Sequence, residues 1–328
     1  MKILLTGGNG FIGSVVVRML RGRGDEVRCL VRPTSRIDRI SSLGCEIVHG
    51  DLRDMTSLSR AARGCNALIH LAGISHWDLI DSPDMPDIVC GGTRNVFEAA
   101  TECGVERAVY VSSTIAVAGS SKPAVHNEDS PYPPFLQSYS YARAKHEAEA
   151  VSRQYSDRMS VSIVNPGEVY GPDDRDLITA GNLVDFAKSD PVVVCQGGMS
   201  ICHIEDVADG MIAALDRGRN GERYILSGEN LSIRALAELT NQLLSRRKIF
   251  LTFPRPIVRA AGWLGRKLSL PLPFNPNVIP YATMYWFTDN AKATRELGVR
   301  FRNAADTLQP VLDWCLNSKR ISGLRVSA

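Results

Sequence analysis

No stretch of the 328-residue sequence holds about 18 consecutive apolar residues, so no membrane-spanning helix is expected. A strand is expected to begin at residue 2, which leaves no room for a signal peptide. The eight cysteines form no C-x-x-C pair, and Cys29 and Cys195 stand within apolar runs, where a free cysteine behaves as a small hydrophobe. These absences predict a reduced, cytoplasmic protein that holds no metal.

A concentrated basic face is also missing. The formal net charge is +3, and 44% of the residues are hydrophobic and 22% charged, which is typical of a globular protein with one large or two modest domains. A protein that binds nucleic acid by neutralising phosphates would be more basic, so no nucleic-acid partner is expected. The densest basic run, residues 246–248, is expected at a helix end, where cations interact well with the helix dipole.

The sequence opens with the pattern of a strand, a tight turn and a helix. Apolar residues 2–5 precede Thr6-Gly7-Gly8-Asn9-Gly10-Phe11-Ile12-Gly13, and helical spacing follows. Glycines here allow a sharp turn, close approach of the backbone to a pyrophosphate, and close packing of a helix whose N-terminal amides bind the anion. Glycines also mark ordinary turns, but this position between strand and helix predicts a dinucleotide-binding loop.

Strands and helices alternate after this loop. Further strands are expected at 26–32, 46–52, 67–73 and 107–114, and alternation of this kind requires right-handed crossovers. We therefore expect an α/β fold of the Rossmann type, with a doubly wound parallel sheet and a smaller, mostly C-terminal substrate-binding lobe. The expected boundaries are 1–165 for the NADP-binding domain, with returning segments near 200–228, and 166–199 with 229–328 mainly for the lobe.

The end of the second strand favours NADP(H) over NAD(H). NAD-specific folds usually carry an acidic residue there for the ribose hydroxyls. Val31 takes this position and Arg32 and Arg36 flank it, which suits a 2′-phosphate, although both arginines are also compatible with a surface loop. Asp51, at the end of the third strand, is expected either to accept the adenine amino group or to cap a helix over residues 52–65.

A tyrosine and a lysine stand four residues apart on the helix expected over residues 138–150. Tyr141 and Lys145 therefore share one face of that helix. A phenol with a pKa near ~10 is a poor acid–base catalyst at neutral pH, and a nearby ammonium favours its phenolate form. The preceding strand ends in Ser112-Ser113-Thr114, at the same sheet edge as the glycine loop. This pattern predicts a proton donor near the nicotinamide end of the cofactor.

Taken together, these motifs resemble the extended short-chain dehydrogenase/reductase superfamily, also called the NAD(P)-dependent epimerase/dehydratase superfamily. Its dihydroflavonol-reductase-like and hydroxysteroid-dehydrogenase-like members look most similar. The matching segments are Thr6-Gly7-x-x-Gly10-x-x-Gly13, Gly50-Asp51-Leu52, Leu71-Ala72-Gly73, Gly92-Thr93-x-Asn95-Val96, Ser112-Ser113-Thr114, Tyr141-x-x-x-Lys145, Asn165-Pro166-Gly167-Glu168-Val169-Tyr170-Gly171-Pro172 and His203-Ile204-Glu205-Asp206-Val207-Ala208.

The resemblance implies catalytic roles for four residues. Tyr141 would exchange the substrate proton, Lys145 would lower the tyrosine pKa and hold the nicotinamide ribose, and Ser113 or Thr114 would steady the substrate oxygen. It also suggests a homodimer through the helices that contain Asn95 and Tyr141. The cofactor-binding residues implied are Gly7, Gly10, Phe11, Ile12, Gly13, Arg32, Arg36, Asp51, Leu52, Leu71, Ala72, Gly73, Lys145, Pro166 and Val169.

Several other positions have an expected role. The sequence departs from the family pattern at Val89, where Asn is frequent, and at Asn165, where Arg is usual; neither change removes a catalytic group. His70 lies within an apolar strand and is expected in the core or behind the catalytic residues. His203 is expected to anchor the start of a helix, and Ser232 to cap another. Residues 119–137 form a long loop that is expected to act as a lid or a substrate wall.

Residues 253–287 are rich in aromatic, aliphatic and proline residues. Three interpretations fit them: an apolar substrate pocket that His76 and Trp77 also line, a membrane-surface patch accompanied by basic residues, or plain lobe core. The basic residues are Arg255, Arg259, Arg266 and Lys267, and the apolar ones include Phe253, Trp263, Leu264, Leu268, Leu270, Leu272, Phe274, Tyr281, Met284 and Trp286.

The function expected from the sequence is NADPH-dependent reduction, reversible as a dehydrogenase reaction, of a ketone or aldehyde on a partly apolar small molecule. The hydride comes from the nicotinamide and the proton from Tyr141. Two alternatives stay open: a nucleotide-sugar epimerase with retained NAD(P), and a non-catalytic NADP-binding regulatory protein.

Overall fold

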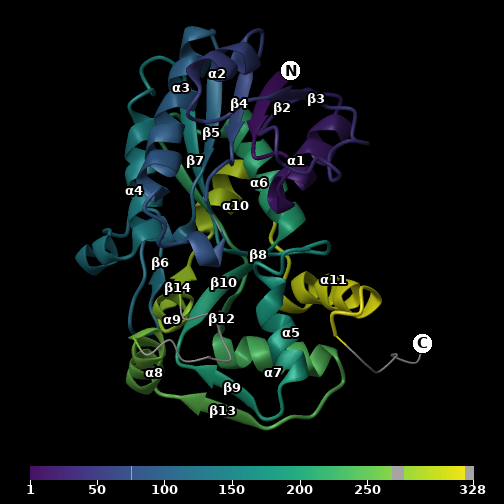
Figure 1. Cartoon of the computed structure of the whole chain (residues 1–328), viewed down its shortest axis with the longest axis vertical. Coiled ribbons are helices and arrows are strands. Elements are labelled where there is room, and N and C mark those ends of the chain that lie inside the picture. The colour runs from purple at the N-terminus through teal and green to yellow at the C-terminus, as the bar shows by residue number, and fades with distance from the viewer. Residues whose placement is uncertain (75, 268–276, 322–328) are drawn as a thin grey trace.

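A computed structural model describes residues 1–74, 76–267 and 277–321, and its largest sheet has seven strands and lies in the upper part of Figure 1. All strands are parallel, in the order β11-β7-β5-β4-β1-β2-β3. The order reverses between β1 and β4, so the expected doubly wound fold is confirmed. The strands are β1 (Lys2–Thr6), β2 (Glu26–Val31), β3 (Glu46–His49), β4 (Ala67–His70), β5 (Arg107–Val111), β7 (Ser160–Pro166) and β11 (Arg223–Leu226).

Helices cover both faces of this sheet. On one face α1 (Phe11–Gly22) packs beside α6 (Ile204–Arg217), and α10 (Ala291–Leu297) packs against α6 and β11. The other face is covered by α2 (Met55–Ala62), α3 (Gly92–Glu102) and α4 (Ser140–Arg153). Segment 291–297, from the region expected to be mainly lobe, thus joins the core of the nucleotide-binding part.

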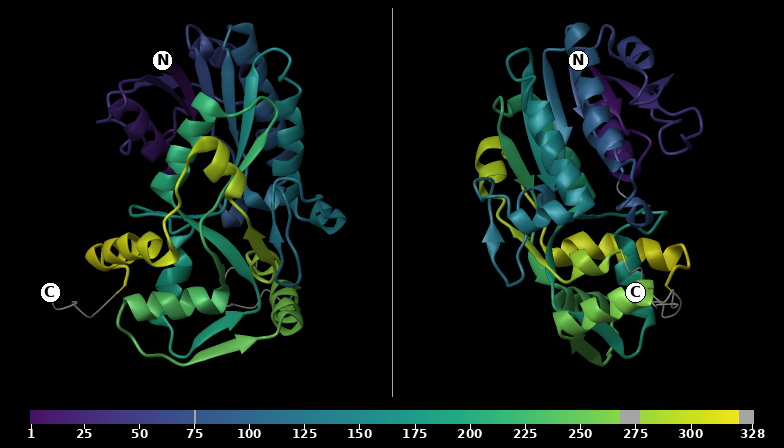
Figure 2. Two further views of the ribbon diagram at one scale, coloured as in Figure 1. Left: turned by 180° about the vertical axis from the view of Figure 1, so that it is seen from behind. Right: turned by 60° about the vertical axis from the view of Figure 1, so that its left-hand side comes forward.

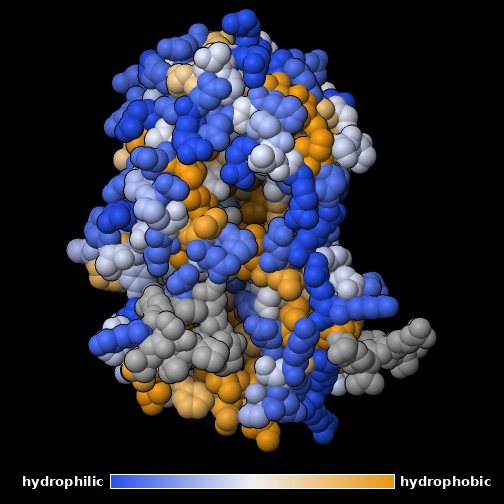
Figure 3. All heavy atoms as spheres, viewed as in Figure 1, coloured by the Kyte–Doolittle hydropathy of each residue, from blue (hydrophilic) through white to orange (hydrophobic). Residues whose placement is uncertain are grey.

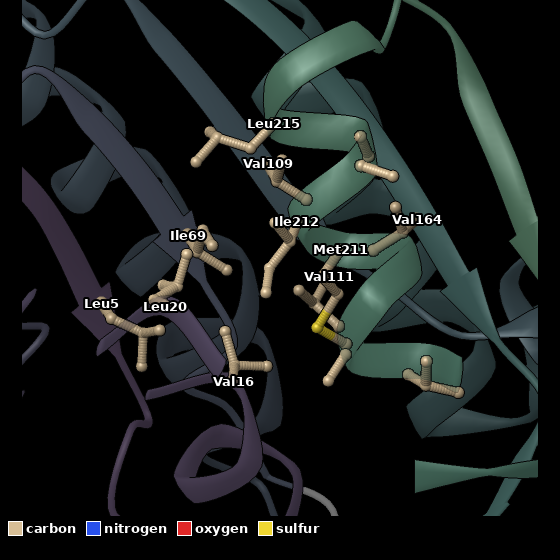
Figure 4. Packing of buried hydrophobic residues seen from close by; sticks show 14 of the residues in the cluster. Leu5, Val16, Leu20, Ile69, Val109, Val111, Val164, Met211, Ile212 and Leu215 are labelled. Carbon is tan, nitrogen blue, oxygen red and sulfur yellow. The ribbon is translucent and has the colours of Figure 1, made fainter. Parts of the chain in front are cut away.

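The apolar stripe of α1 explains its position. Val16, Val17 and Leu20 are fully buried against the sheet and α6, and the close-up of this core shows Val16 and Leu20 (Figure 4). Complete burial of one such side chain contributes about 1.5–3 kcal/mol. The packing therefore fixes the N-terminus of α1 directly after the glycine loop, at the carboxyl ends of the strands.

The lobe contains two smaller sheets. One has the order β12-β10-β14-β6, with β8 paired to β10, and the other pairs β13 with β9. Their bounds are β6 (Val125–His126), β8 (Glu168–Tyr170), β9 (Val192–Cys195), β10 (Gly198–His203), β12 (Asn230–Ser232), β13 (Phe250–Phe253) and β14 (Tyr285–Thr288). The helices of the lobe are α5 (Ala180–Lys188), α7 (Ile233–Leu243), α8 (Arg255–Lys267), α9 (Ile279–Ala282) and α11 (Ala304–Asn317).

The long loop 119–137 is attached both to the lobe and to the edge strand of the seven-stranded sheet. Its short strand β6 pairs with β14, and Glu128 Oε1 accepts a hydrogen bond from the Ile225 amide of β11. Short helical turns occupy Trp77–Leu79, Thr114–Ala116 and Pro134–Ser138, and a π-helical turn occupies Pro86–Gly91. Across the described residues, no helix is long and apolar enough to cross a bilayer.

Several local predictions are confirmed and two are corrected. Ser232 caps α7 by accepting from the Ala235 amide, and His203 caps α6. The helix expected over 52–65 is shorter, because Asp54 accepts from the Thr56 amide and starts it at Met55. The capping role considered for Asp51 is therefore wrong.

The basic run 246–248 follows the end of α7, as expected. Arg246 and Lys248 also donate to the Ala187 carbonyl, at the C-terminal end of the neighbouring helix α5. These cations therefore complement the dipole of α5 as well.

Candidate active site

The glycine loop forms a cradle that leaves no room for side chains. Gly7 has a φ of 76°, and a Cβ there would lie 2.9 Å from the Ala72 nitrogen. A Cβ on Gly13 would lie 2.1 Å from the Gly7 carbonyl oxygen. Gly10 precedes α1 without any side-chain cap, and the first turn holds no acidic residue. Bare helix amides beside a Cβ-free loop fit the pyrophosphate of a dinucleotide.

The end of β2 lies next to this loop. Arg32 is exposed there, directly after the buried Val31, and the Arg36 guanidinium lies 3.6 Å from the Asp176 carboxylate. The Arg53 side chain hydrogen-bonds to Asp51 and, with the Arg53 amide, lowers the pKa of that carboxyl. The expected adenosine end of the site is therefore cationic at Arg32 and Arg36 and anionic at Asp51.

His70 of β4 links Thr6 of β1 to Thr93 of α3 through hydrogen bonds. Its Nδ1 lies 2.6 Å from Thr6 Oγ1, and its Nε2 lies 3.1 Å from Thr93 Oγ1. Thr93 donates its own proton to the Val89 carbonyl, so His70 Nε2–H donates to Thr93 and Nδ1 accepts from Thr6. Burial, with the Lys145 charge, lowers the pKa of His70 to about 3. The expected structural role of His70 is confirmed.

Tyr141 and Ser113 meet at the carboxyl edge of the sheet. Desolvation raises the pKa of Tyr141 to about 12, and a hydrogen bond with Ser113 opposes this rise. Ser113 is half-buried, whereas Thr114 is buried at the start of a helical turn. At neutral pH the Tyr141 hydroxyl keeps its proton, as a proton donor requires.

Lys145 lies one turn along α4 from Tyr141 and is also buried. Its Nζ donates to the Val111 carbonyl over 2.9 Å, and a Cβ on Gly73 would lie 3.8 Å from it. Burial lowers the pKa of Lys145 to about 8, although the Glu149 charge opposes this. The pKa of Tyr141 is raised overall because desolvation of the phenol outweighs its hydrogen bond with Ser113, and the lowering of this pKa by Lys145 stays a prediction.

The comparisons with known proteins agree with this geometry. A family model described as "NAD dependent epimerase/dehydratase family" matches residues 3–227. The chain belongs to this family. As a member of the epimerase/dehydratase family, it is an NAD(P)-dependent oxidoreductase of the extended short-chain dehydrogenase/reductase type.

Individual relatives match over most of the chain. The putative dihydroflavonol 4-reductase of Synechocystis sp. is 30% identical over 95% of this chain and 94% of its own. The 4-hydroxy-2-methyl-3-oxo-4-farnesyl-3,4-dihydroquinoline-1-oxide ketoreductase of Stigmatella aurantiaca is 29% identical over 82% and 80%. A solved structure of DesIV, the dTDP-glucose 4,6-dehydratase of Streptomyces venezuelae, with NAD bound, has a TM-score of 0.77 at 25% identity and covers 96% and 97%.

A buried carboxylate behind Lys145 was not predicted from the sequence. Glu149 is 0% exposed and forms ion pairs with Arg153 and Arg223, at 3.4 and 3.0 Å. The Asn165 amide nitrogen donates to Glu149 Oε1 over 2.7 Å and to the Ser113 carbonyl over 2.9 Å. Asn165, at the position where the family pattern has Arg, thus joins the ion cluster to the backbone of Ser113.

A second polar group lies on the lobe side and was also missed. Tyr170 Oη donates to Glu168 Oε1 over 3.0 Å, and the Asn182 amide nitrogen donates to both, over 3.2 Å to Glu168 Oε1 and 2.7 Å to Tyr170 Oη. Burial raises the pKa of Glu168 to about 7, against the effect of these hydrogen bonds. Glu168 and Tyr170 belong to a motif recognised in the sequence, but Asn182 comes from the later helix α5.

Aromatic side chains border Tyr141. The Trp77 and Tyr281 rings are 5.6 Å apart, and Tyr281 also contacts the Tyr139 and Trp286 rings at 5.2 and 6.1 Å. His76 lies outside this cluster, near Asp78. The space-filling view shows a hollow near the middle of the molecule with hydrophobic residues at its floor (Figure 3).

The aromatic segment 253–287 therefore divides between two environments. Tyr281, Met284 and Trp286 are buried in the cluster beside Tyr141, whereas Phe253, Trp263 and Leu264 are exposed. Four residues named from the sequence, Leu268, Leu270, Leu272 and Phe274, lie outside the described residues.

Proposed function

We propose that the protein is an NADPH-dependent reductase of a ketone or aldehyde on a partly apolar small molecule. The observation that carries the proposal is the position of Tyr141, which is hydrogen-bonded to Ser113 and packed against the aromatic cluster of Trp77, Tyr139, Tyr281 and Trp286. A proton donor beside an apolar wall suits a carbonyl on a hydrophobic skeleton. The name of the Stigmatella ketoreductase, which acts on a farnesylated ring ketone, supports this substrate class.

Ser113, Tyr141 and Lys145 each have a separate role in the proposed reaction. Ser113 and Tyr141 donate hydrogen bonds to the carbonyl oxygen, and this orients its carbon toward the glycine-loop side of the site. When bound, the dinucleotide supplies the hydride that the carbonyl carbon accepts. The carbonyl oxygen then takes the Tyr141 proton, and the product is an alcohol. Lys145, as a buried ammonium 2.9 Å from the Val111 carbonyl, stabilises the negative charge left on Tyr141.

We assign Ser113 rather than Thr114 as the substrate-orienting hydroxyl. Ser113 shares a hydrogen bond with Tyr141 and is half-buried, while Thr114 is 4% exposed. Asn165 holds the Ser113 carbonyl, so the serine backbone is fixed with its side chain toward Tyr141. Replacement of Ser113 by Ala should therefore lower turnover more than replacement of Thr114 by Ser.

NADPH preference rests on the end of β2. Arg32 is exposed beside the glycine loop, so its guanidinium is available to a 2′-phosphate. The position before it holds Val31 and not a carboxylate, so a ribose hydroxyl would lack an acceptor there. The holding residues proposed are the glycine loop with Arg32 and Arg36. Arg32→Ala should raise the KM for NADPH at least tenfold and leave the KM for NADH within about twofold, with exposed Arg63→Ala as the control.

The test of the mechanism is Tyr141→Phe, assayed by NADPH oxidation with a panel of apolar and polar ketones and aldehydes. We expect turnover to fall at least a thousandfold while the NADPH dissociation constant, from nucleotide fluorescence, stays unchanged. Tyr155→Phe is the matched control, because Tyr155 also belongs to a buried cluster but its hydroxyl donates to the Arg94 carbonyl. Near-normal turnover in Tyr141→Phe would contradict the mechanism.

A nucleotide-sugar epimerase is the second candidate, and the polar group of Glu168, Tyr170 and Asn182 favours it because carboxylate and amide groups bind sugar hydroxyls. This function predicts that the purified protein retains its dinucleotide and interconverts nucleotide sugars without net NADPH oxidation. Ketone-dependent NADPH oxidation by protein that carries no dinucleotide would exclude it.

A further inference from the structure

The outer face of the β9–β13 sheet is apolar and exposed. The inner face of this two-stranded sheet packs on α7, with Val192, Val194 and Phe250 in the lobe core. Alternation along the strands places Ile249, Leu251 and Phe253 on the opposite face, and Val193 lies beside Leu251 in the strand register. These four side chains are 40–66% exposed. A solvent-facing sheet surface would normally carry polar residues at these positions.

Helix α8 follows β13 in the chain and also exposes apolar side chains. Gly262 packs against Ile279, so the opposite side of the helix faces outward. Ile257, Trp263 and Leu264 stand on that side and are 55%, 58% and 46% exposed. Helix α8 and strand β13 both lie at the end of the molecule farthest from the N-terminus (Figures 1 and 2), where Figure 3 shows hydrophobic residues gathered. We call the seven exposed apolar residues of these elements the lobe-tip surface: Val193, Ile249, Leu251, Phe253, Ile257, Trp263 and Leu264.

The segment that carries most of the lobe-tip surface holds charges of one sign. Between residues 239 and 288 the sequence contains no Asp or Glu, and its charged residues are Arg246, Arg247, Lys248, Arg255, Arg259, Arg266 and Lys267. The Lys267 ammonium lies 4.9 Å from the centre of the Trp263 ring, and Arg247 is exposed just before Ile249. A tryptophan with a cation beside it matches the boundary between acyl chains and anionic headgroups.

We propose that the lobe-tip surface binds the surface of an anionic phospholipid bilayer. Exposed aliphatic and aromatic side chains enter the headgroup region, and the exposed Arg247 and Lys267 contact lipid phosphates. A second copy of the chain fits this surface less well, because a twofold interface would place the acid-free segment of one copy against the same segment of the other. A bilayer instead supplies both an apolar layer and negative charge.

The test is sedimentation of the full-length protein with vesicles. Vesicles of equal parts phosphatidylglycerol and phosphatidylcholine should bind the protein at least tenfold more tightly than pure phosphatidylcholine vesicles. Raising NaCl from 0.1 to 1 M should weaken binding severalfold, because the Debye length falls from about 10 to about 3 Å. Fluorescence should shift to the blue on binding, and the shift should be lost in Trp263→Phe.

Two variants test whether vesicle binding depends on the lobe-tip surface. Ile257→Ser with Leu264→Ser should lower the vesicle partition coefficient at least tenfold, while Val125→Ser, an exposed aliphatic on β6, should leave it unchanged. Unchanged thermal unfolding would show that the double variant is folded. The proposal is overturned if wild-type protein ignores the anionic vesicles, if the double variant binds them equally, or if the variant instead abolishes a dimer in solution without affecting vesicle binding.

Discussion

The hydrogen bonds of His70 should make the free energy of unfolding fall at acidic pH, and replacement of His70 should remove this contribution to the pH dependence. Both ring nitrogens are used by neutral imidazole, since Nδ1 accepts from Thr6 and Nε2–H donates to Thr93. Protonation of Nδ1 would take away the acceptor of the Thr6 hydroxyl proton and add a positive charge near Lys145, in a buried site. The folded protein therefore resists protonation of His70, and its pKa is lowered to about 3.

The size of the effect follows from linkage. The unfolded chain takes up a proton at His70 near pH ~6.5, whereas the folded chain takes it up near pH 3, so the free energy of unfolding falls as the pH drops between these values. Each pH unit in this window costs about 1.4 kcal/mol. Between pH 7 and pH 4.5 the contribution of His70 is a loss of about 2.5 kcal/mol.

The assay is urea unfolding of the wild type and of His70→Asn at pH 7 and pH 4.5. An asparagine amide oxygen still accepts from Thr6, so the variant should fold, with lower stability at pH 7 from the lost bond to Thr93. Its loss of stability on acidification should be about 2.5 kcal/mol smaller than that of the wild type. Exposed His49→Asn is the control and should follow the wild type. Parallel pH dependences of the wild type and His70→Asn would refute the reasoning.

Three further predictions concern the candidate active site. Because burial lowers the pKa of Lys145 to about 8 while Tyr141 keeps its proton to about 12, kcat/KM for ketone reduction should fall as the pH rises above 8, and Lys145→Arg should move this fall to higher pH. Asn165→Ala should lower kcat about ten- to a hundredfold with the NADPH dissociation constant unchanged, because it frees the Ser113 backbone. Gly13→Ala should weaken NADPH binding at least tenfold, because its Cβ would meet the Gly7 carbonyl at 2.1 Å.

Each of these has a comparison that isolates the cause. A rate that stays flat to pH 10 would contradict the role of Lys145. Asn241→Ala removes another buried amide, in α7, and should cost stability without slowing turnover. Gly22→Ala lies on the same helix as Gly13 but in open space, so it should leave NADPH binding unchanged.

The parts of the fold that depend on local pattern could be predicted from the sequence. Short segments of consecutive residues determine the apolar strands, the glycine loop and the helix that carries Tyr141 and Lys145. The structure has the expected strands and doubly wound sheet. Helix ends are harder to predict from the sequence. Asp51 and Asp54 are both able to cap a helix, and only the backbone geometry makes Asp54 the N-cap of α2.

Contacts between distant segments could not be predicted. Nothing near Asn165 in the sequence indicates that it faces both Glu149 and Ser113, and a two-residue strand such as β6 is too short to show a period. The aromatic cluster beside Tyr141 also depends on contacts between distant segments, since Trp77 follows β4 while Tyr281 belongs to α9. Such contacts depend on the path of the whole chain through both parts.

The place of β11 at the edge of the main sheet has a consequence for synthesis. Strand β7 is complete at Pro166, but its partner β11 begins only at Arg223, after β8, α5, β9, β10 and α6 have been made. Until then a nascent chain carries β7 as an open edge, and Val164 waits for α6 to cover its face of the sheet. Unpaired strand edges are templates for aggregation. The β7 edge therefore stays open for pairing with another chain while residues 167–222 are translated.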